Sequence, residues 1–174
     1  MQRNSKICRF KENEMSPEVV FRPGEILGYR FNNGKYYVSK SLPFDNDRVP
    51  FVEYVLDGIA DLYFYYDSNG ENFVIEKEDG PMIRLDNQEM VIEDEYGTKY
   101  IHKSKRYVGQ LKAAFSEAPE LHPTLEQMNL SLKPMIQATK KYHEYVCGDQ
   151  ECIIFEKKPP IFKATFRRRF GTNG

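Results

Sequence analysis

The chain has 174 residues, the size of one domain, and folding at that length buries roughly 70% of the surface of the unfolded chain. Its 25 Lys and Arg residues nearly balance its 26 Asp and Glu residues, so the formal net charge of -1 excludes a global field that would attract nucleic acid or an acidic partner. No apolar run reaches about 18 residues and the N-terminus has no apolar core, so we expect neither a membrane-spanning helix nor a secretory signal in the chain as given.

Aromatic residues make up 14% of the chain, with 12 Tyr and 12 Phe, and this favours β structure because planar side chains fit a half-buried pleated surface. Turn signals recur at even spacing and separate short runs that are rich in aromatic and β-branched residues. The predicted strands are 7–10, 19–21, 26–31, 35–39, 51–56, 61–66, 73–77, 82–85, 90–93, 100–101 and 153–155. The pattern predicts an antiparallel meander that forms a curled sheet or an open barrel.

The apolar periodicity changes to that of a helix near residue 105. Val108, Leu111 and Phe115 follow at helical spacing, and Pro119 is expected to end this first helix. One further turn is predicted at 124–128. The second helix is expected to begin after Asn129 or Ser131, with one apolar stripe formed by Leu132, Met135, Ile136, Thr139, Tyr142 and Val146. The predicted fold class is therefore α+β, mainly β, with two C-terminal helices covering the sheet.

Residues 161–170 follow a Lys-Lys-Pro-Pro sequence and alternate between apolar and polar side chains, which is typical of a transmembrane barrel strand. We therefore divide the chain into a mainly β domain with a helical cover, residues 1–158, and a linker with the start of a barrel strand, residues 159–174. The strand at 7–10 begins so abruptly that we expect the first strands of the domain to lie upstream. Arg167, Arg168 and Arg169 are a single basic cluster in a neutral chain, so nucleic acid is not an expected partner.

Cys147 and Cys152 are candidates for a disulfide that joins the end of the second helix to the following strand. A turn with Gly148 separates them, and a tight turn can bring their Cα atoms within the roughly 7 Å that a disulfide requires. The bridge would need an oxidising compartment, and Cys8 would remain unpaired. The alternative is two small buried thiols.

His143 and Cys147 are weak candidates for metal ligands, because residues four apart share one face of a helix. Cys152 and Cys8 would complete a set of four, but the usual Cys-x-x-Cys spacing is absent. A His near the end of a helix more often packs or caps than binds a metal. We therefore expect no metal and no cofactor.

Two acidic clusters, 76–79 and 93–95, can supply paired carboxylates for acid–base catalysis. Both are predicted at turns, where neither burial nor a partner would tune their pKa values, and solvated hairpin tips are the alternative. His102 and His122 have no Ser, Cys or Asp at a recognisable spacing. The sequence therefore predicts a protein that is not an enzyme, with a carboxylate-dependent hydrolase as the third hypothesis.

Tyr54, Tyr63 and Tyr65 are the candidate ligand-binding residues. They belong to the most aromatic strands, and aligned tyrosines can form a stacking platform for a sugar or another small ligand. Alternate residues of a strand face opposite sides, so only half of the aromatic run 63–66 can line one surface. Cross-strand aromatic packing is the alternative explanation.

Four segments carry a resemblance to a known group of proteins. They are Gly34-Lys-Tyr-Tyr-Val-Ser-Lys40, Asp61-Leu-Tyr-Phe-Tyr-Tyr-Asp67, Phe73-Val-Ile-Glu-Lys77 and, above all, the run from Leu132 to Lys157. This pattern resembles the soluble region that precedes a porin-like outer-membrane β-barrel in poorly characterised envelope proteins of Bacteroides-type bacteria. The resemblance implies a secreted precursor, localisation to the cell envelope (periplasm and outer membrane) and a barrel beginning near Ile161. It implies no catalytic residues.

We therefore expect a non-enzymatic, periplasm-side interaction module of an envelope barrel protein. Its partner would be another protein or its own barrel domain, bound through a sheet edge or an aromatic face. Contact with a membrane would come only through the following barrel. The alternative is a small-ligand or glycan-binding module that uses the Tyr-rich strands.

Overall fold

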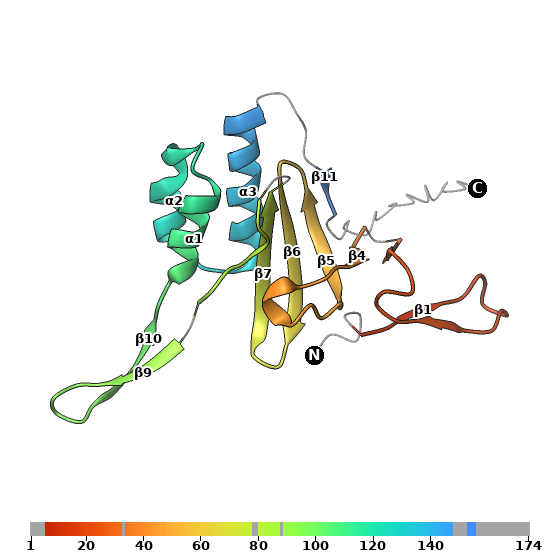
Figure 1. Ribbon diagram of the computed structural model, residues 1–174, viewed down its shortest axis with the longest axis horizontal. Coiled ribbons are helices and arrows are strands. Elements are labelled where there is room, and N and C mark those ends of the chain that lie inside the picture. Colours follow the sequence, from red (N-terminus) through yellow and green to blue (C-terminus); the bar gives the residue numbers. More distant parts are fainter. Residues whose placement is uncertain (1–5, 33, 78–79, 88, 148–152, 156–174) are drawn as a thin grey trace, which may run out of the picture.

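The computed structural model of the chain describes residues 6–32, 34–77, 80–87, 89–147 and 153–155 (Figure 1). The strands are β1 (Cys8–Phe10), β2 (Val19–Phe21), β3 (Gly28–Arg30), β4 (Tyr36–Ser39), β5 (Phe51–Asp57), β6 (Ala60–Asp67), β7 (Gly70–Lys77), β8 (Ile83–Arg84), β9 (Glu89–Glu93), β10 (Lys99–Lys103) and β11 (Ile153–Ile154). The helices are α1 (Arg106–Ala114), α2 (His122–Gln127) and α3 (Leu132–Cys147), with short 3-10 turns η2 (Pro43–Asp45) and η3 (Pro119–Leu121). The fold is α+β and mainly β, as the sequence predicts.

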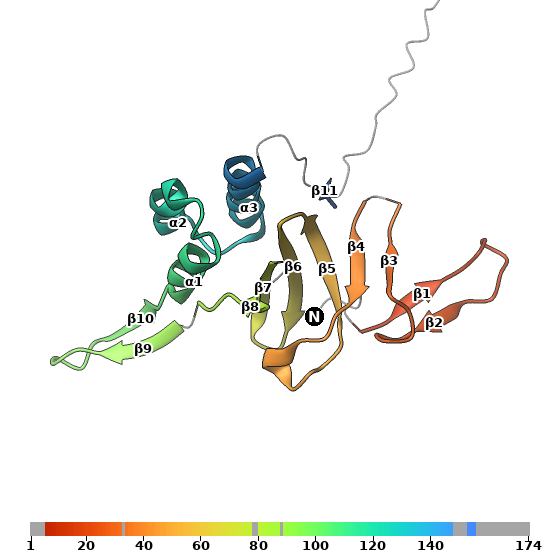
Figure 2. The same ribbon diagram turned by 45° about the horizontal axis from the view of Figure 1, so that its top comes forward.

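The large sheet has the strand order β3-β4-β5-β6-β7-β8, and each strand is antiparallel to its neighbour. The predicted meander is confirmed for these strands, which form an open sheet with β3 and β8 at its edges (Figure 2). A bulge interrupts β5, because Tyr54 pairs with Tyr63 while Leu56 pairs with Leu62. The extra residue, Val55, accepts a hydrogen bond at its carbonyl from the N–H of Phe155, beside the pairing of β11 with β5.

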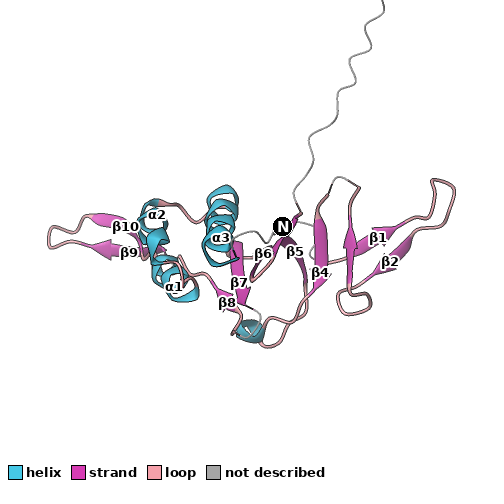
Figure 3. Cartoon of the chain, turned by 90° about the horizontal axis from the view of Figure 1, so that it is seen from above, coloured by secondary structure: helices cyan, strands magenta, loops and turns pink. Residues whose placement is uncertain are grey.

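The three helices lie on one side of this sheet and enclose the main core (Figure 3). The apolar stripe of α3 packs against the sheet as predicted, with Met135, Ile136 and Tyr142 buried, whereas Val146 at the end of the stripe is exposed. Leu62, Phe64, Phe73 and Ile75 are the side chains of β6 and β7 that meet the helices. Since alternate residues face opposite sides, Tyr63 and Tyr65 lie on the other face.

The prediction that Pro119 ends the first helix is wrong by several residues. Helix α1 ends at Ala114, and Phe115 leaves the helical conformation while its N–H still bonds the carbonyl of Leu111. The ring of Phe115 is fully buried and stacks on Tyr142 of α3, with ring centroids 4.3 Å apart. This stacking fixes the chain beyond α1, and Pro119 instead begins the 3-10 turn η3.

The strands β9 and β10 do not continue the large sheet, which corrects the prediction of a single meander. They form a separate two-stranded hairpin that projects from the body of the molecule (Figure 1). The chain turns away from β7 at Asp86, whose backbone N–H bonds Gln110 Oε1 and whose carbonyl accepts from the N–H of Tyr107, both in α1. Helix α1 thus takes the backbone groups that a neighbouring strand would use.

The hairpin of β1 and β2 is also separate from the large sheet and lies at the opposite end of the molecule from β9 and β10 (Figure 3). Among the described residues, no helix combines the length and the apolar character needed to cross a membrane. The predicted linker and barrel strand, residues 159–174, and Gly148 lie outside the described residues.

Candidate functional site

The three tyrosines proposed as ligand-binding residues lie on the sheet face that points away from the helices. Tyr54 of β5 is the cross-strand partner of Tyr63 of β6, and their rings stack with centroids 4.7 Å apart and planes 24° apart. Tyr65 follows on the same face two residues along β6. The three candidate residues therefore share one surface of the sheet.

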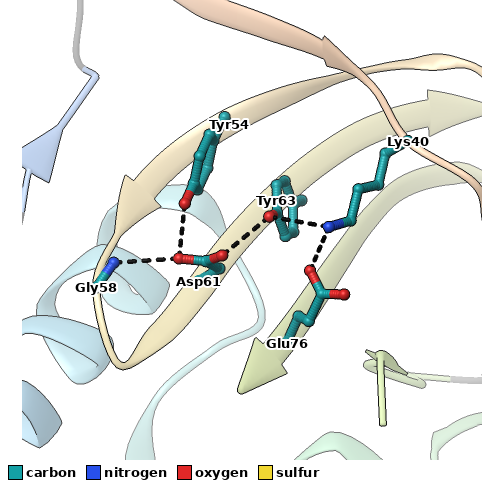
Figure 4. Close-up of polar contacts among 6 residues, drawn as sticks. All are labelled: Lys40, Tyr54, Gly58, Asp61, Tyr63 and Glu76. Carbon is teal, nitrogen blue, oxygen red and sulfur yellow. Dashed lines mark hydrogen bonds and ion pairs between the residues drawn. The ribbon is translucent and has the colours of Figure 1, made fainter. Parts of the chain in front are cut away.

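Asp61 is the centre of a polar network on this face (Figure 4). Its Oδ1 accepts hydrogen bonds from the hydroxyl of Tyr54 at 2.7 Å and from the N–H of Gly58 at 3.1 Å. Its Oδ2 accepts from the hydroxyl of Tyr63 at 3.0 Å. One carboxylate thus fixes both stacked tyrosines and the turn between β5 and β6.

Lys40 extends this network to the next strand. Its Nζ lies 2.5 Å from Glu76 Oε2, donates to the hydroxyl of Tyr63 at 3.3 Å and sits 4.9 Å from the centroid of the Tyr63 ring. Glu76 of β7 is the direct cross-strand partner of Asp61. The two carboxylates are neighbours on one face, but each already has its own donors (Figure 4).

Burial raises the pKa of both stacked tyrosines. For Tyr54, the hydrogen bond to Asp61 adds to the effect of burial, and for Tyr63 the negative charges of Asp61 and Glu76 add to it. A raised tyrosine pKa keeps the hydroxyl protonated and therefore able to donate. The two protonated hydroxyls therefore act as hydrogen-bond donors. A tyrosine that acts as a nucleophile or base would instead need a lowered pKa, so that the phenolate forms.

Tyr65 is only 3% exposed, and its hydroxyl has no well-formed hydrogen bond among the described residues. Burial raises the pKa of this hydroxyl, and the guanidinium of Arg84 opposes that effect. Leu42 and Val52 pack in the same cluster, half-buried Phe44 lies against it, and the guanidinium of Arg48 lies 6.0 Å from the centroid of the Tyr65 ring. Tyr63 is buried as well. The face is filled by its own side chains, so cross-strand packing accounts for these tyrosines, and ligand binding by them stays a prediction.

His143, the candidate metal ligand on α3, is buried against the turn between β5 and β6. Its Nε2 lies 3.1 Å from the backbone nitrogen and 3.2 Å from the backbone oxygen of Ala60, and the tautomer decides which bond forms. Burial lowers the pKa of His143 and favours the neutral ring. Within the described residues, no group of three His, Cys, Asp or Glu side chains is placed to hold a metal ion. His143 here joins the helix to the sheet.

The predicted disulfide falls partly outside the described residues. Cys147 ends α3 and is half-buried, whereas Cys152 is not described, so the bridge stays a prediction. Cys8 of β1 is buried beside Tyr37 and Phe51, and burial raises the pKa of its thiol, which disfavours the reactive thiolate. Cys8 therefore anchors the first hairpin to the sheet.

The two acidic clusters differ in their surroundings. Glu76 belongs to the network around Lys40, while residues 78–79 lie outside the described residues. In the second cluster, Asp94 accepts hydrogen bonds from the hydroxyl of Tyr100 and the N–H of Tyr96 at an exposed hairpin tip. These bonds lower the pKa of Asp94, which is the direction expected for a carboxylate that stabilises a turn.

Sequence reasoning missed Asp61 and Lys40 as members of a site. The spacing of Asp61 and Tyr63, two residues apart in a strand, is a signal that both share a face. The position of Lys40 has no such signal, because it depends on how β4 lies beside β5 and on the path of the chain beyond it.

The hairpin of β9 and β10 carries apolar side chains on both of its faces. Val91 pairs with Ile101 on one face and Ile92 pairs with Tyr100 on the other. These side chains are 69%, 66%, 47% and 47% exposed, in that order. Near the tip, the Nζ of Lys99 lies 3.9 Å from Glu93 Oε2. The hairpin therefore presents two exposed apolar surfaces with charged residues beside them.

The first hairpin has a weaker version of the same feature, because Phe10, Val19 and Val20 are about half exposed. Its inner end is held to the sheet by the buried Cys8, whereas the described side chains of β9 and β10 include no buried residue. The second hairpin is therefore the less supported of the two.

Comparisons with known proteins identify no relative: no family model, no curated protein and no solved structure matches the chain.

Proposed function

We propose that this chain is a protein-interaction module and that the hairpin of β9 and β10 is its main contact arm. The observation that carries the proposal is the exposure of Val91 and Ile101 on one face and of Ile92 and Tyr100 on the other. An isolated two-stranded hairpin is marginally stable in water, and a contiguous exposed apolar surface is typical of a protein-binding site.

The physical gain from a partner is substantial. Burying an exposed aliphatic side chain fully contributes roughly 1.5–3 kcal/mol, and the hairpin offers three such side chains together with a tyrosine. A partner strand can also pair with the open backbone edge of β9 or β10, which adds hydrogen bonds to the apolar contact. The hairpin supplies both kinds of interaction on one short element.

A narrower form of the proposal places the module on the periplasmic side of an envelope barrel protein, where the partner is the barrel or another envelope protein. The resemblance of the segments 34–40, 61–67, 73–77 and 132–157 to such proteins supports it. The matching test is the natural reading frame. Continuation beyond Gly174 into alternating strands is the expected result, and a frame that ends there would remove the barrel from the proposal.

The interaction itself is tested by site-specific photo-crosslinking. A photoreactive amino acid replaces Ile101 on the arm, and the control carries it at Leu27, a loop residue that is 92% exposed. The expected result is one protein crosslinked from position 101 and none from position 27. This difference would exclude non-specific crosslinking through an exposed apolar side chain.

The crosslinked protein is then purified and its binding to the chain is measured directly. The double variant Val91→Thr, Ile101→Thr keeps β-branched side chains while removing apolar surface, and we expect it to lose most of the affinity. The variant Leu27→Thr should bind as the wild type does. Equal binding by all three proteins would refute the role of the arm.

A further inference from the structure

A gap in the outer edge of β7 opens where the chain leaves the large sheet. Strand β8 pairs with β7 only through Val74 and Ile75, and the last backbone bond runs from the N–H of Leu85 to the carbonyl of Phe73. Beyond this point Asp86 bonds to α1. Gly70–Asn72 at the start of β7 therefore has β6 on one side and, among the described residues, no strand on the other.

The direction of the backbone groups in this gap follows from the geometry of a strand. The carbonyl of Phe73 points away from β6, since it accepts from Leu85. Residues two apart in a strand point their N–H and C=O groups to the same side. The N–H and C=O of Glu71 therefore also point outward into the gap, where no described strand meets them.

A pocket of about 600 Å³ fills this gap. It is lined by Asn69, Glu71 and Asn72, by residues 84–87 and by Leu130, which precedes α3. The size is within the range of roughly 300–1,000 Å³ that is typical of binding pockets. Unlike most such pockets it is predominantly polar, and this argues against an apolar small molecule as its occupant.

Several of the polar groups that line the pocket are only partly engaged. Asn72 donates through Nδ2 to the carbonyl of Gly70, and Glu71 Oε1 accepts from the hydroxyl of Tyr66 at 2.5 Å, so Asn72 Oδ1 and Glu71 Oε2 can still accept hydrogen bonds. The Oδ1 of Asn87 is buried without a hydrogen-bond partner among the described residues. Side-chain amides beside an open pair of backbone groups match the alternating donors and acceptors of a peptide backbone.

We propose that this pocket binds an extended peptide segment of a partner protein, which adds to β7 as a short strand in line with β8. The N–H and C=O of Glu71 would bond to its backbone, and the amides of Asn69 and Asn72 would bond its polar groups. Asp86 is paired with Arg106 and the guanidinium of Arg84 lies over the ring of Phe44, whereas the carboxylate of Glu71 has no ion pair among the described residues. A neutral or basic peptide therefore fits better than an acidic one. This inference rests on the proposed function, because it assumes a protein partner, but it uses a different surface.

The test uses a phage-displayed library of linear heptapeptides as the probe, with the purified chain as the target. The binding of selected peptides is then compared in two variants of the same residue. Glu71→Pro removes the outward N–H, which β6 does not use, and Glu71→Ala removes the carboxylate but keeps that N–H. We expect Glu71→Pro to weaken binding by roughly tenfold or more and Glu71→Ala to change it far less.

Hydrogen exchange of the wild-type protein supplies a second readout that does not depend on how well the proline variant folds. A bound peptide should slow the exchange of the Glu71 amide, because strand addition covers it. A library that yields no binder overturns the proposal, as do selected peptides that bind both variants equally or leave the Glu71 amide exchanging freely. Equal peptide binding by the Val91→Thr, Ile101→Thr protein separates this site from the arm.

Discussion

Substituting Ala for Gly58 should destabilise the protein strongly, because Gly58 lies against the buried ring of His143. A methyl group added at Gly58 would lie 1.9 Å from His143 Cε1 and 2.5 Å from Nδ1, distances at which one group must move. The ring is 3% exposed and is held by Ala60. Overpacking typically costs about 1–3 kcal/mol, and breaking a buried hydrogen bond adds about 1–3 kcal/mol, so the expected loss is roughly 2–6 kcal/mol.

Urea denaturation followed by circular dichroism measures this loss. Gly109→Ala is the matched control, because Gly109 is exposed in α1 and an added methyl group there would meet nothing within 4 Å. This control should gain stability by about 0.5–1 kcal/mol from the helix propensity of Ala. In a His143→Ala background the Gly58→Ala substitution should cost much less. An equal cost in both backgrounds would refute the steric explanation.

Two other predictions concern His143 and the tyrosines on the opposite face of the sheet. Burial lowers the pKa of His143 below its ordinary value of 6.5, against the opposing effects of Ala60, Asp61 and Asp57, so the unfolded chain binds more protons than the folded one just below that pH. The wild type should therefore lose stability as the pH falls from 6.5 towards the folded-state pKa, and denaturation of His143→Gln across this range should show a smaller loss. Tyr63→Phe should cost about 0.5–1.5 kcal/mol, because its hydroxyl bonds Asp61, whereas Tyr65→Phe should cost less, because the hydroxyl of Tyr65 has no well-formed hydrogen bond among the described residues and interacts only with the guanidinium of Arg84. Equal costs for the two phenylalanine variants in urea denaturation would contradict the assignment of these hydroxyls.

Periodic patterns account for the parts of the fold that the sequence predicts well. The stripe from Leu132 to Tyr142 places α3 correctly, since apolar residues that recur every 3.6 residues form a single face of a helix and that face must be buried. The turn signals likewise separate β5, β6 and β7, because Gly and Asn at the corners favour tight turns. Local chemistry determines these elements.

The errors have a different origin, because they depend on contacts between segments far apart in the sequence. Phe115 ends α1 early by stacking on Tyr142, a partner in another helix. The tyrosines proposed as a platform share one face, but nothing in their spacing shows that Leu42 and Lys40 fill that face. Alternation predicts which side of a sheet a residue faces, and it contains no information on what covers that side.

Gln110 of α1 explains how the fold produces both proposed contact surfaces, and it supports a final prediction. Its Oε1 accepts from the N–H of Asp86 and its Nε2 donates to the carbonyl of Arg84, so one side-chain amide occupies the edge of β8 as a neighbouring strand would. This contact directs the chain away from β7, which leaves the gap at Glu71 and sends β9 outward.

Replacing Gln110 by Ala should therefore cost roughly 1–3 kcal/mol and speed hydrogen exchange at Asp86, because the backbone groups of two residues lose their partner. Gln110→Glu is the matched control, because the carboxylate keeps an acceptor for the N–H of Asp86 but has no donor for the carbonyl of Arg84. Exchange at Asp86 should stay slow in that variant even though stability falls. Fast exchange in both variants, or in neither, would show that the amide of Gln110 does not hold the chain at this point.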